Sequence, residues 1–221
     1  MPSTIAIIGA GPLGRSLALR AARAGFRVFL EDVMPSNLHH AREFIRTELS
    51  AEGMAASLAA TPPEKAIEPA QGSEASIEVK GTGFSPCIEG AKEKGASAPE
   101  GFIPVVFVST VEDAVRTADL IIDCVPDELE SKLEILWLLD RMAPPHAVFA
   151  TPTTTQSIAD LASCTYRPGK CIAIAAEPAT LAECTGPTIQ LRTAPATTPE
   201  TIALVDQFWR ALGLIPQFEA A

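Results

Sequence analysis

Residues 4–32 read TIAIIGAGPLGRSLALRAARAGFRVFLED, and this stretch decides the fold. An apolar run over residues 5–8 leads into three glycines, and apolar residues at helical spacing follow until Gly25. A second apolar run over residues 28–30 ends at Asp32. Short apolar runs bounded by turn residues are typical of buried strands. The stretch therefore predicts a strand, a tight turn, a helix and a second strand.

The three glycines of the turn, Gly9, Gly11 and Gly14, each meet a different geometric need. The first permits a sharp turn, the second lets a pyrophosphate approach the backbone, and the third lets the helix pack closely on the sheet. The helix begins at Pro12 and Leu13, and its first turn offers free N–H groups and a partial positive charge to phosphates. These five residues are therefore predicted to bind a dinucleotide; a tight turn without a ligand is the alternative.

Asp32 ends the second strand at the position where a carboxylate can accept hydrogen bonds from an adenosine ribose. A 2′-phosphate there would meet the carboxylates of Glu31 and Asp32, and the next residues, Val33 and Met34, offer no arginine to bind it. The predicted cofactor is therefore NAD rather than NADP.

The composition favours a globular protein that binds small molecules. The chain has 221 residues, 47% of them hydrophobic, which is enough for a sizeable core. Its formal net charge of −10 at pH 7 argues against nucleic acid and anionic membranes as partners. No apolar run reaches the roughly 18–20 residues that a membrane helix requires. Because the first strand begins almost at once, we expect no signal peptide and a cytoplasmic protein.

The cysteines and histidines predict neither disulfides nor a metal site. The five cysteines are odd in number and form no Cys-x-x-Cys pair, so they are expected to be reduced. Cys124 and Cys171 lie in apolar runs, where a free cysteine behaves as a small hydrophobic residue. His39 and His40 share a predicted helix without a third ligand near by and are expected at the surface.

Residues 51–101 differ in composition from the rest of the chain. They are dominated by alanine, glycine, proline, serine, glutamate and lysine, and lack the apolar surface that would offset the entropy of ordering them. They are predicted to form a long flexible insertion, either disordered or a functional lid. Strands and helices alternate on both sides of it. The predicted fold is therefore a Rossmann-type, doubly wound, mostly parallel α/β sheet in a single domain over residues 1–221.

Among the later elements we expect buried strands over residues 120–125 and 171–176. Between them, residues 129–142 are expected to form an amphipathic helix whose apolar face includes Trp137.

With these segments read, the chain resembles the NAD-binding domain of the 3-hydroxyacyl-CoA dehydrogenases. The resemblance is carried by GAGPLG with Asp32, VEDAVRTADLIIDCVPDELESK, APPHAVFATPTTTQSIADLA and YRPGK. It implies that Asp127 and Lys132 lie near the cofactor, whereas an ordinary solvated helix start is the alternative. It also implies that Thr154 meets the cofactor and the substrate oxygen, although Pro152 replaces the family's asparagine and a threonine here can simply cap a helix.

The family's catalytic base is missing from this sequence. In the family, a histidine on the strand after YRPGK takes the hydroxyl proton and a glutamate orients it. Here the histidine position falls on Ile174 or Ala175, and the glutamate position falls near Gly186. Glu177 or Glu183 is the substitute base, provided that burial raises its pKa.

Two functions follow from the resemblance. The first is an NAD-dependent oxidoreductase acting on a small 3-hydroxyacyl substrate such as an acyl-CoA, with Thr154 and Glu177 as its catalytic residues. The second is a catalytically silent NAD(H) sensor, or one subunit of a split enzyme, because the family continues into a helical domain and this sequence ends at Ala221. A homo-oligomer or a separate helical subunit is the expected assembly.

Overall fold

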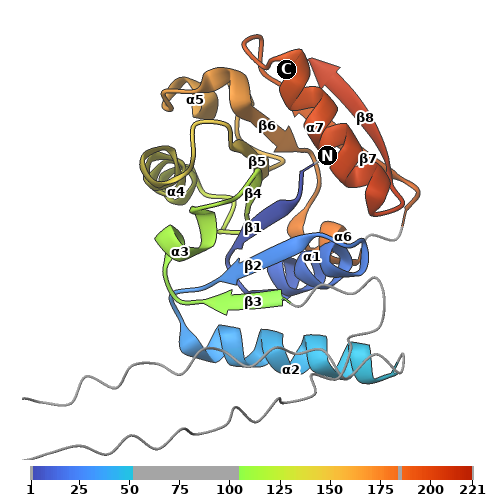
Figure 1. The fold of residues 1–221 in the computed structure, drawn as a ribbon. Helices are drawn as coiled ribbons and strands as arrows, with labels where there is room; N and C mark the ends of the chain where they lie inside the picture. Colours follow the sequence, from blue (N-terminus) through green and yellow to red (C-terminus); the bar gives the residue numbers. More distant parts are fainter. Residues whose placement is uncertain (1, 52–104, 184–185, 221) are drawn as a thin grey trace, which may run out of the picture.

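The computed structural model describes residues 2–51, 105–183 and 186–220. The predicted insertion, apart from Ala51, lies outside these ranges. Within them one sheet of eight strands forms the centre, in the order β3-β2-β1-β4-β5-β6-β7-β8, with helices on both faces (Figure 1).

The strands are β1 (Thr4–Ile8), β2 (Arg27–Glu31), β3 (Val105–Val108), β4 (Leu120–Asp123), β5 (Val148–Pro152), β6 (Cys171–Ile174), β7 (Thr188–Thr193) and β8 (Ile215–Ala220). The helices are α1 (Pro12–Arg23), α2 (Pro35–Ala51), α3 (Val111–Val115), α4 (Leu129–Met142), α5 (Ile158–Ser163), α6 (Pro178–Glu183) and α7 (Pro199–Ala211), with a short 3₁₀ helix at Pro168–Lys170.

The first six strands run parallel, and their order reverses on either side of β1. Only β7 and β8 run in the opposite direction: β7 pairs antiparallel with β6, and β8 pairs parallel with β7. The predicted Rossmann-type, mostly parallel sheet is therefore confirmed. In such a sheet, ligands bind at the carboxyl ends of the strands where the order reverses.

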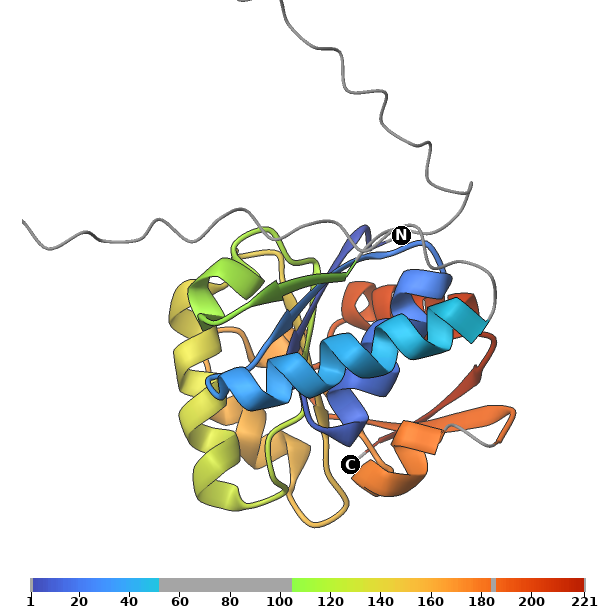
Figure 2. The same ribbon diagram turned by 90° about the horizontal axis from the view of Figure 1, so that it is seen from below.

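The core is split into two layers, because helices cover both faces of the sheet. In β1, Ile5 and Ile7 belong to the layer under α1, α2, α6 and α7, whereas Ala6 and Ile8 belong to the layer under α3, α4 and α5 (Figures 1 and 2). Every residue of β1 is buried. Burial on both faces explains why the strand reads as an unbroken apolar run.

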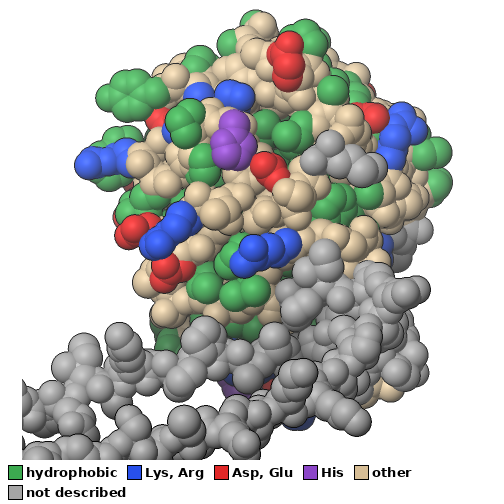
Figure 3. Space-filling model, in the orientation of Figure 1, with side chains coloured by type: hydrophobic (Ala, Val, Ile, Leu, Met, Phe, Trp, Pro, Cys, Tyr) green, Lys and Arg blue, Asp and Glu red, His purple; other side chains and the backbone are tan. Residues whose placement is uncertain are grey.

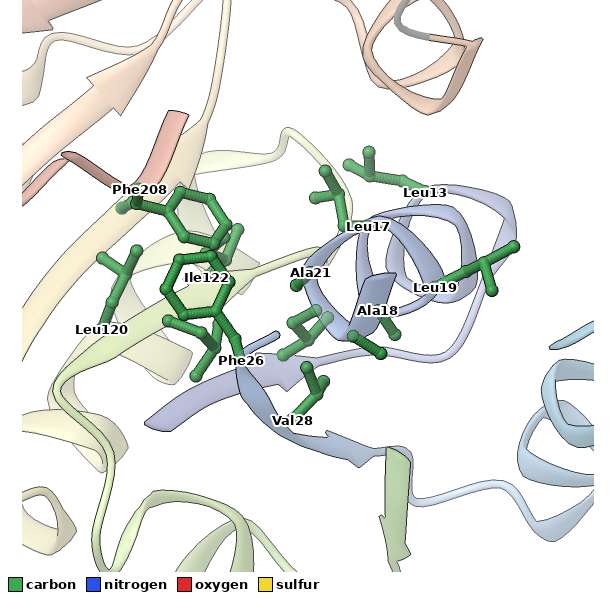
Figure 4. Packing of buried hydrophobic residues seen from close by; sticks show 14 of the residues in the cluster. Leu13, Leu17, Ala18, Leu19, Ala21, Phe26, Val28, Leu120, Ile122 and Phe208 are labelled. Carbon is green, nitrogen blue, oxygen red and sulfur yellow. The ribbon is translucent and has the colours of Figure 1, made fainter. Parts of the chain in front are cut away.

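Helix α1 packs closely on the sheet because small residues face it. Figure 4 shows Ala18 and Ala21 turned toward the strands, with the rings of Phe26 and Phe208 beside them. The centroids of these two rings are 5.3 Å apart. This close packing fixes the start of α1 against the end of β1, where the glycine turn lies.

Two predictions about later elements need correction. Strands β4 and β6 end at Asp123 and Ile174, earlier than expected, so that residues 124–127 and 175–177 are free to form loops. Trp137 is 54% exposed, and its ring lies under the guanidinium of Arg141, 4.7 Å away. The buried face of α4 instead includes two charged residues, Lys132 and Asp140, which a purely apolar stripe does not reveal. No helix in the described ranges is both long and apolar enough to span a bilayer.

Candidate dinucleotide site

The glycine turn between β1 and α1 contains two different kinds of glycine. Gly9 has φ +100°, and its N–H donates to the carbonyl of Glu31 at 2.8 Å, which ties the turn to the end of β2. A Cβ at Gly14 would lie 1.8 Å from the carbonyl oxygen of Gly9, whereas a Cβ at Gly11 would meet no atom within 4 Å. The fold therefore requires Gly14, and the space beside Gly11 is open to a ligand.

The first turn of α1 borders this space, and no side chain caps its backbone N–H groups. Gly11 is the N-cap, and Pro12 is the first helical residue. The first turn also holds no acidic residue, so the partial positive charge of the helix end is not neutralised. A cavity of about 250 Å³ lies against Pro12, Leu13 and Gly14 and is bounded on its other side by Cys124. Such a helix end binds anions.

Asp32 is held rigidly beside the turn. Its Oδ2 accepts hydrogen bonds from the Ala10 N–H at 2.8 Å and from Asn37 Nδ2 at 3.0 Å, and its Oδ1 accepts one from the Met34 N–H at 2.8 Å. The side chain is 8% exposed. A carboxylate oxygen can accept more than one hydrogen bond, so Oδ1 keeps capacity for a ligand hydroxyl.

A second cavity, of about 480 Å³, opens at the carboxyl ends of β1, β2 and β4. This is the point at which the strand order reverses. Most of its wall is apolar, and a few polar groups reach it, as is usual for small-molecule sites. The apolar wall residues include Ile8, Val33, Val111, Val125, Pro126, Ile135 and Leu138.

Asp127 connects the loop after β4 to the turn after β5 that contains Thr153, Thr154 and Thr155, called the threonine turn below. Its Oδ2 accepts hydrogen bonds from the Thr154 N–H at 3.0 Å and from Thr155 Oγ1 at 3.2 Å. Burial alone would raise the pKa of Asp127, but the hydrogen bonds from Thr153, Thr154 and Thr155 outweigh it and hold the pKa below its ordinary value. The residue is therefore an anion that positions the threonine turn.

The structure brings the two candidate catalytic residues into contact. Thr154 follows β5 and Glu177 follows the neighbouring strand β6, and Thr154 Oγ1 donates to Glu177 Oε1 at 3.0 Å. Both side chains are exposed. Glu183, the other acid considered as a base, lies in α6, where its backbone carbonyl accepts a hydrogen bond from Arg20. Glu177 is thus the acid that meets the threonine hydroxyl.

The strand position of the missing histidine pairs with β7. The Ala175 N–H donates to the carbonyl of Gln190 at 2.9 Å, and Ile174 pairs with Leu191. That the family's glutamate position falls near Gly186 stays a prediction; Gly186 lies just before β7, the strand that pairs with β6.

Lys132 lies deeper than expected. Its side chain is fully buried, and its Nζ bonds to Asp123 Oδ1 at 2.5 Å. The alternative of a solvated helix start is therefore excluded for this residue. Contact between Lys132 and a cofactor would require the ion pair to open, whereas Asp127 is partly accessible beside the threonine turn.

Of the cysteines singled out in the sequence, Cys171 lies in β6 and Cys124 directly follows β4, whereas Cys87 and Cys184 lie outside the described residues. Burial raises the pKa of Cys171 to about 11 and also raises that of Cys124, so both thiols stay neutral and pack as apolar groups. His39 and His40 are exposed on α2. In the described part of the chain, no group of three or more His, Cys, Asp or Glu side chains could hold a metal ion.

Sequence reasoning overlooked one site residue. The sequence analysis considered Glu31 only as a charge that opposes a 2′-phosphate. In the structure the residue is 2% exposed and lines the larger cavity. The available signal was an acid at the buried end of a strand, where an apolar residue is the rule.

Comparison with known proteins finds a matching family model and related dehydrogenases. The family model described as "3-hydroxyacyl-CoA dehydrogenase, NAD binding domain" matches residues 4–97 and 87–216. A probable 3-hydroxybutyryl-CoA dehydrogenase of Bacillus subtilis (strain 168) is 26% identical over 168 residues, which cover 76% of this chain and 46% of that protein. The 5-formyl-3-hydroxy-2-methylpyridine 4-carboxylate 5-dehydrogenase of Mesorhizobium japonicum is 25% identical over 220 residues, covering 98% of this chain and 57% of that protein. The chain therefore spans about half the length of these relatives.

Solved structures show the same fold. The 3-hydroxybutyryl-CoA dehydrogenase from Escherichia coli K12 superposes with a TM-score of 0.71 at 19% identity, covering 100% of this chain and 38% of that one. The 5-formyl-3-hydroxy-2-methylpyridine 4-carboxylic acid 5-dehydrogenase, described as an NAD⁺-dependent dismutase, gives a TM-score of 0.69 at 24% identity, covering 100% of this chain and 58% of that one.

Proposed function

We propose, from the premise that this chain belongs to the family of 3-hydroxyacyl-CoA dehydrogenase NAD-binding domains, that it is the cofactor-binding part of an NAD-dependent oxidoreductase. The observation that carries the proposal is the open space beside Gly11 at an uncapped helix start. A pyrophosphate fits such a space, because backbone N–H groups and the helix dipole both favour an anion there.

The proposed binding residues follow the strand order. Gly9, Gly11, Pro12, Leu13 and Gly14 form the cradle for the pyrophosphate. On one side, Asp32 of the β2 end takes the adenosine ribose. On the other side, Asp127 and the threonine turn face the nicotinamide half. Lys132 supports this side through its buried contact with Asp123 rather than by touching the cofactor.

The chemistry proposed for the threonine turn is alcohol–carbonyl interconversion on a small hydroxy substrate, for which a 3-hydroxyacyl-CoA is the first candidate. Bound NAD⁺ supplies a hydride acceptor. Thr154 Oγ1 hydrogen-bonds the substrate oxygen, and Glu177 beside it takes the hydroxyl proton. The alcohol thus loses one proton and one hydride and becomes a carbonyl. Asp127 holds Thr154 in place through its backbone N–H.

A second candidate function is NAD(H) binding without turnover, in a sensor or in one subunit of a split enzyme. It is favoured by the composition of β6 and the loop after it. Neither Ile174 nor Ala175 can accept a proton, and Glu177 is exposed rather than buried. A homo-oligomer or a separate helical subunit would then complete the cleft.

A titration with NADH tests the cofactor site. The Gly11→Val variant is expected to lose measurable NADH binding, because its side chain occupies the space proposed for the pyrophosphate. It is expected to fold normally, because an added Cβ there meets no atom within 4 Å. Fluorescence titration measures the affinity, and circular dichroism with thermal unfolding verifies the fold. Unchanged affinity in a folded variant would refute the site.

A turnover assay separates the two functions. We expect the 221-residue chain alone to bind NADH without oxidising it in the presence of acetoacetyl-CoA, because β6 carries no histidine and its substitute, Glu177, is exposed to water. Positioned acid–base catalysis contributes about 10²–10⁴-fold to rate. Turnover at about 1–10³ per second would instead show that Thr154 and Glu177 suffice. In that case Glu177→Gln should abolish the activity.

A further inference from the structure

The larger cavity contains one acid that the proposed chemistry does not use. Glu31 is the last residue of β2, its side chain is 2% exposed, and it lines the cavity. Its Oε1 has no hydrogen-bond partner among the described residues. A buried carboxyl oxygen without a partner is costly, so its retention points to a ligand that supplies one.

No positive charge in the described part of the cavity wall compensates Glu31. The other acids that line the wall are its neighbour Asp32 and Glu134 of α4. Helix α2 contributes the uncharged Asn37, and the loop after β4 begins with Cys124, whose thiol stays neutral. The remaining residues of the cavity wall are uncharged.

This environment favours the neutral carboxyl. Burial, followed by the charge of Asp32, raises the pKa of Glu31 to about 7. Near neutral pH a large fraction of the side chain is therefore protonated. A protonated carboxyl presents an O–H donor beside a C=O acceptor.

The adenine ring presents the matching pair of groups. Its amino group is a donor, and the neighbouring ring nitrogen is an acceptor. The cavity also lies at the adenosine end of the proposed site, because Asp32 follows β2 whereas Thr154 follows β5, with β1 and β4 between them. Its apolar walls suit the flat faces of a base.

We propose that Glu31, as a neutral carboxyl, recognises the adenine ring of NAD(H), accepting a hydrogen bond from the amino group and donating one to the neighbouring ring nitrogen. The inference rests on the proposed dinucleotide site. It makes Glu31 a specificity-determining residue of that site and makes cofactor affinity dependent on pH.

The pH dependence has a definite sign. Ionised Glu31 loses the donor and places a buried charge against a ring nitrogen, so affinity falls as pH rises above the pKa. If only the neutral form binds, the dissociation constant for NADH rises up to about 30-fold between about pH 6 and about pH 8.5. Glu31→Gln keeps a donor beside an acceptor and cannot ionise, so its affinity should be constant over this range. Glu31→Leu loses the contact at every pH.

Calorimetric titration of the full chain tests the proposal with two probes. One is NADH, and the other is etheno-NADH, in which a two-carbon bridge blocks the amino group and the neighbouring ring nitrogen. At about pH 6, the wild-type chain and Glu31→Gln should bind NADH about tenfold or more tightly than etheno-NADH, which corresponds to one or two hydrogen bonds. Glu31→Leu should bind the two equally.

Glu130→Gln is the matched control, since it removes an exposed carboxylate on α4 that does not line the cavity. It should follow the wild-type profile. If the wild-type chain binds NADH at neither pH, the dinucleotide site itself is refuted. If NADH binds but Glu31→Leu is indistinguishable from wild type, or Glu31→Gln keeps the wild-type pH dependence, the site stands and the role of Glu31 is refuted.

Discussion

The buried pair of Asp123 and Lys132 joins the end of β4 to α4 beneath the candidate site. Both side chains are at most 1% exposed, and Asp123 Oδ2 has no further partner among the described residues. Removing the ammonium leaves a buried carboxylate uncompensated, so Lys132→Met should lower the free energy of unfolding by about 3–5 kcal/mol. Urea denaturation measures this loss. Adding Asp123→Asn should recover part of it, and a double variant as unstable as the single one would contradict the explanation.

Glu31 should also make folding stability depend on pH. Its folded-state pKa of about 7 lies above the ordinary value of 4.5. Its contribution is therefore fully present below about pH 4.5 and is lost as pH rises through about pH 7. Relative to wild type, Glu31→Gln should gain about 1–2 kcal/mol at about pH 8.5, less than the full linkage value because the cavity opens to solvent, and little at about pH 4.5. Thermal unfolding at both pH values measures the difference; an equal effect at both would contradict it.

At the residue scale, the tight glycine turn was predicted from the sequence, because its geometry is set by neighbours along the chain. The cofactor-binding roles of Asp32 and the three glycines stay predictions. The protonation of Glu31 and the burial of Lys132 could not be predicted, because they depend on residues brought together by folding.

At the scale of the elements, packing is tested most directly at the glycine turn, which joins β1 to α1. Gly14→Ala would force a methyl group to within 1.8 Å of a backbone oxygen. Because backbone rather than a flexible side chain must move, we expect a loss of about 3 kcal/mol or more in unfolding free energy. Gly11→Ala adds the same group in open space, so it should cost only the preference for glycine over alanine at an N-cap, about 1 kcal/mol or less. Similar losses in the two variants would show that the turn is not built as described.

The helices and strands also show which structural features the hydrophobic periodicity of the sequence can predict. The longer helices and the parallel strands were predicted, apart from the ends of β4 and β6, because their periodicity is local. The antiparallel course of β7 was not predicted, because the pairing of two strands depends on how the whole sheet assembles. Trp137 was misplaced because α4 buries polar residues along the stripe that the pattern assigns to apolar ones.

The molecule as a whole should discriminate between NAD and NADP. The face seen in Figure 3 mixes acidic and basic side chains, so the net charge of −10 is not gathered into a single patch there. Selection then depends on the local carboxylate of Asp32, which lies at the end of β2 beside the proposed ribose position. At low salt NADH should bind about tenfold or more tightly than NADPH, and the preference should shrink as salt is added. Competition titrations at two ionic strengths measure both effects; equal affinities at low salt would contradict the assignment.

The two kinds of glycine in the turn also bear on descent. Gly14 would be retained by any lineage that keeps this fold, because a methyl group there strikes the backbone. Gly11 has an ordinary backbone conformation with φ −65° and empty space around it, so nothing in the fold itself opposes a larger residue. A lineage that had stopped using the dinucleotide would be free to let Gly11 drift while holding Gly14. Of the two positions, Gly11 is the one at which a loss of the cofactor would first become visible in the sequences of descendants.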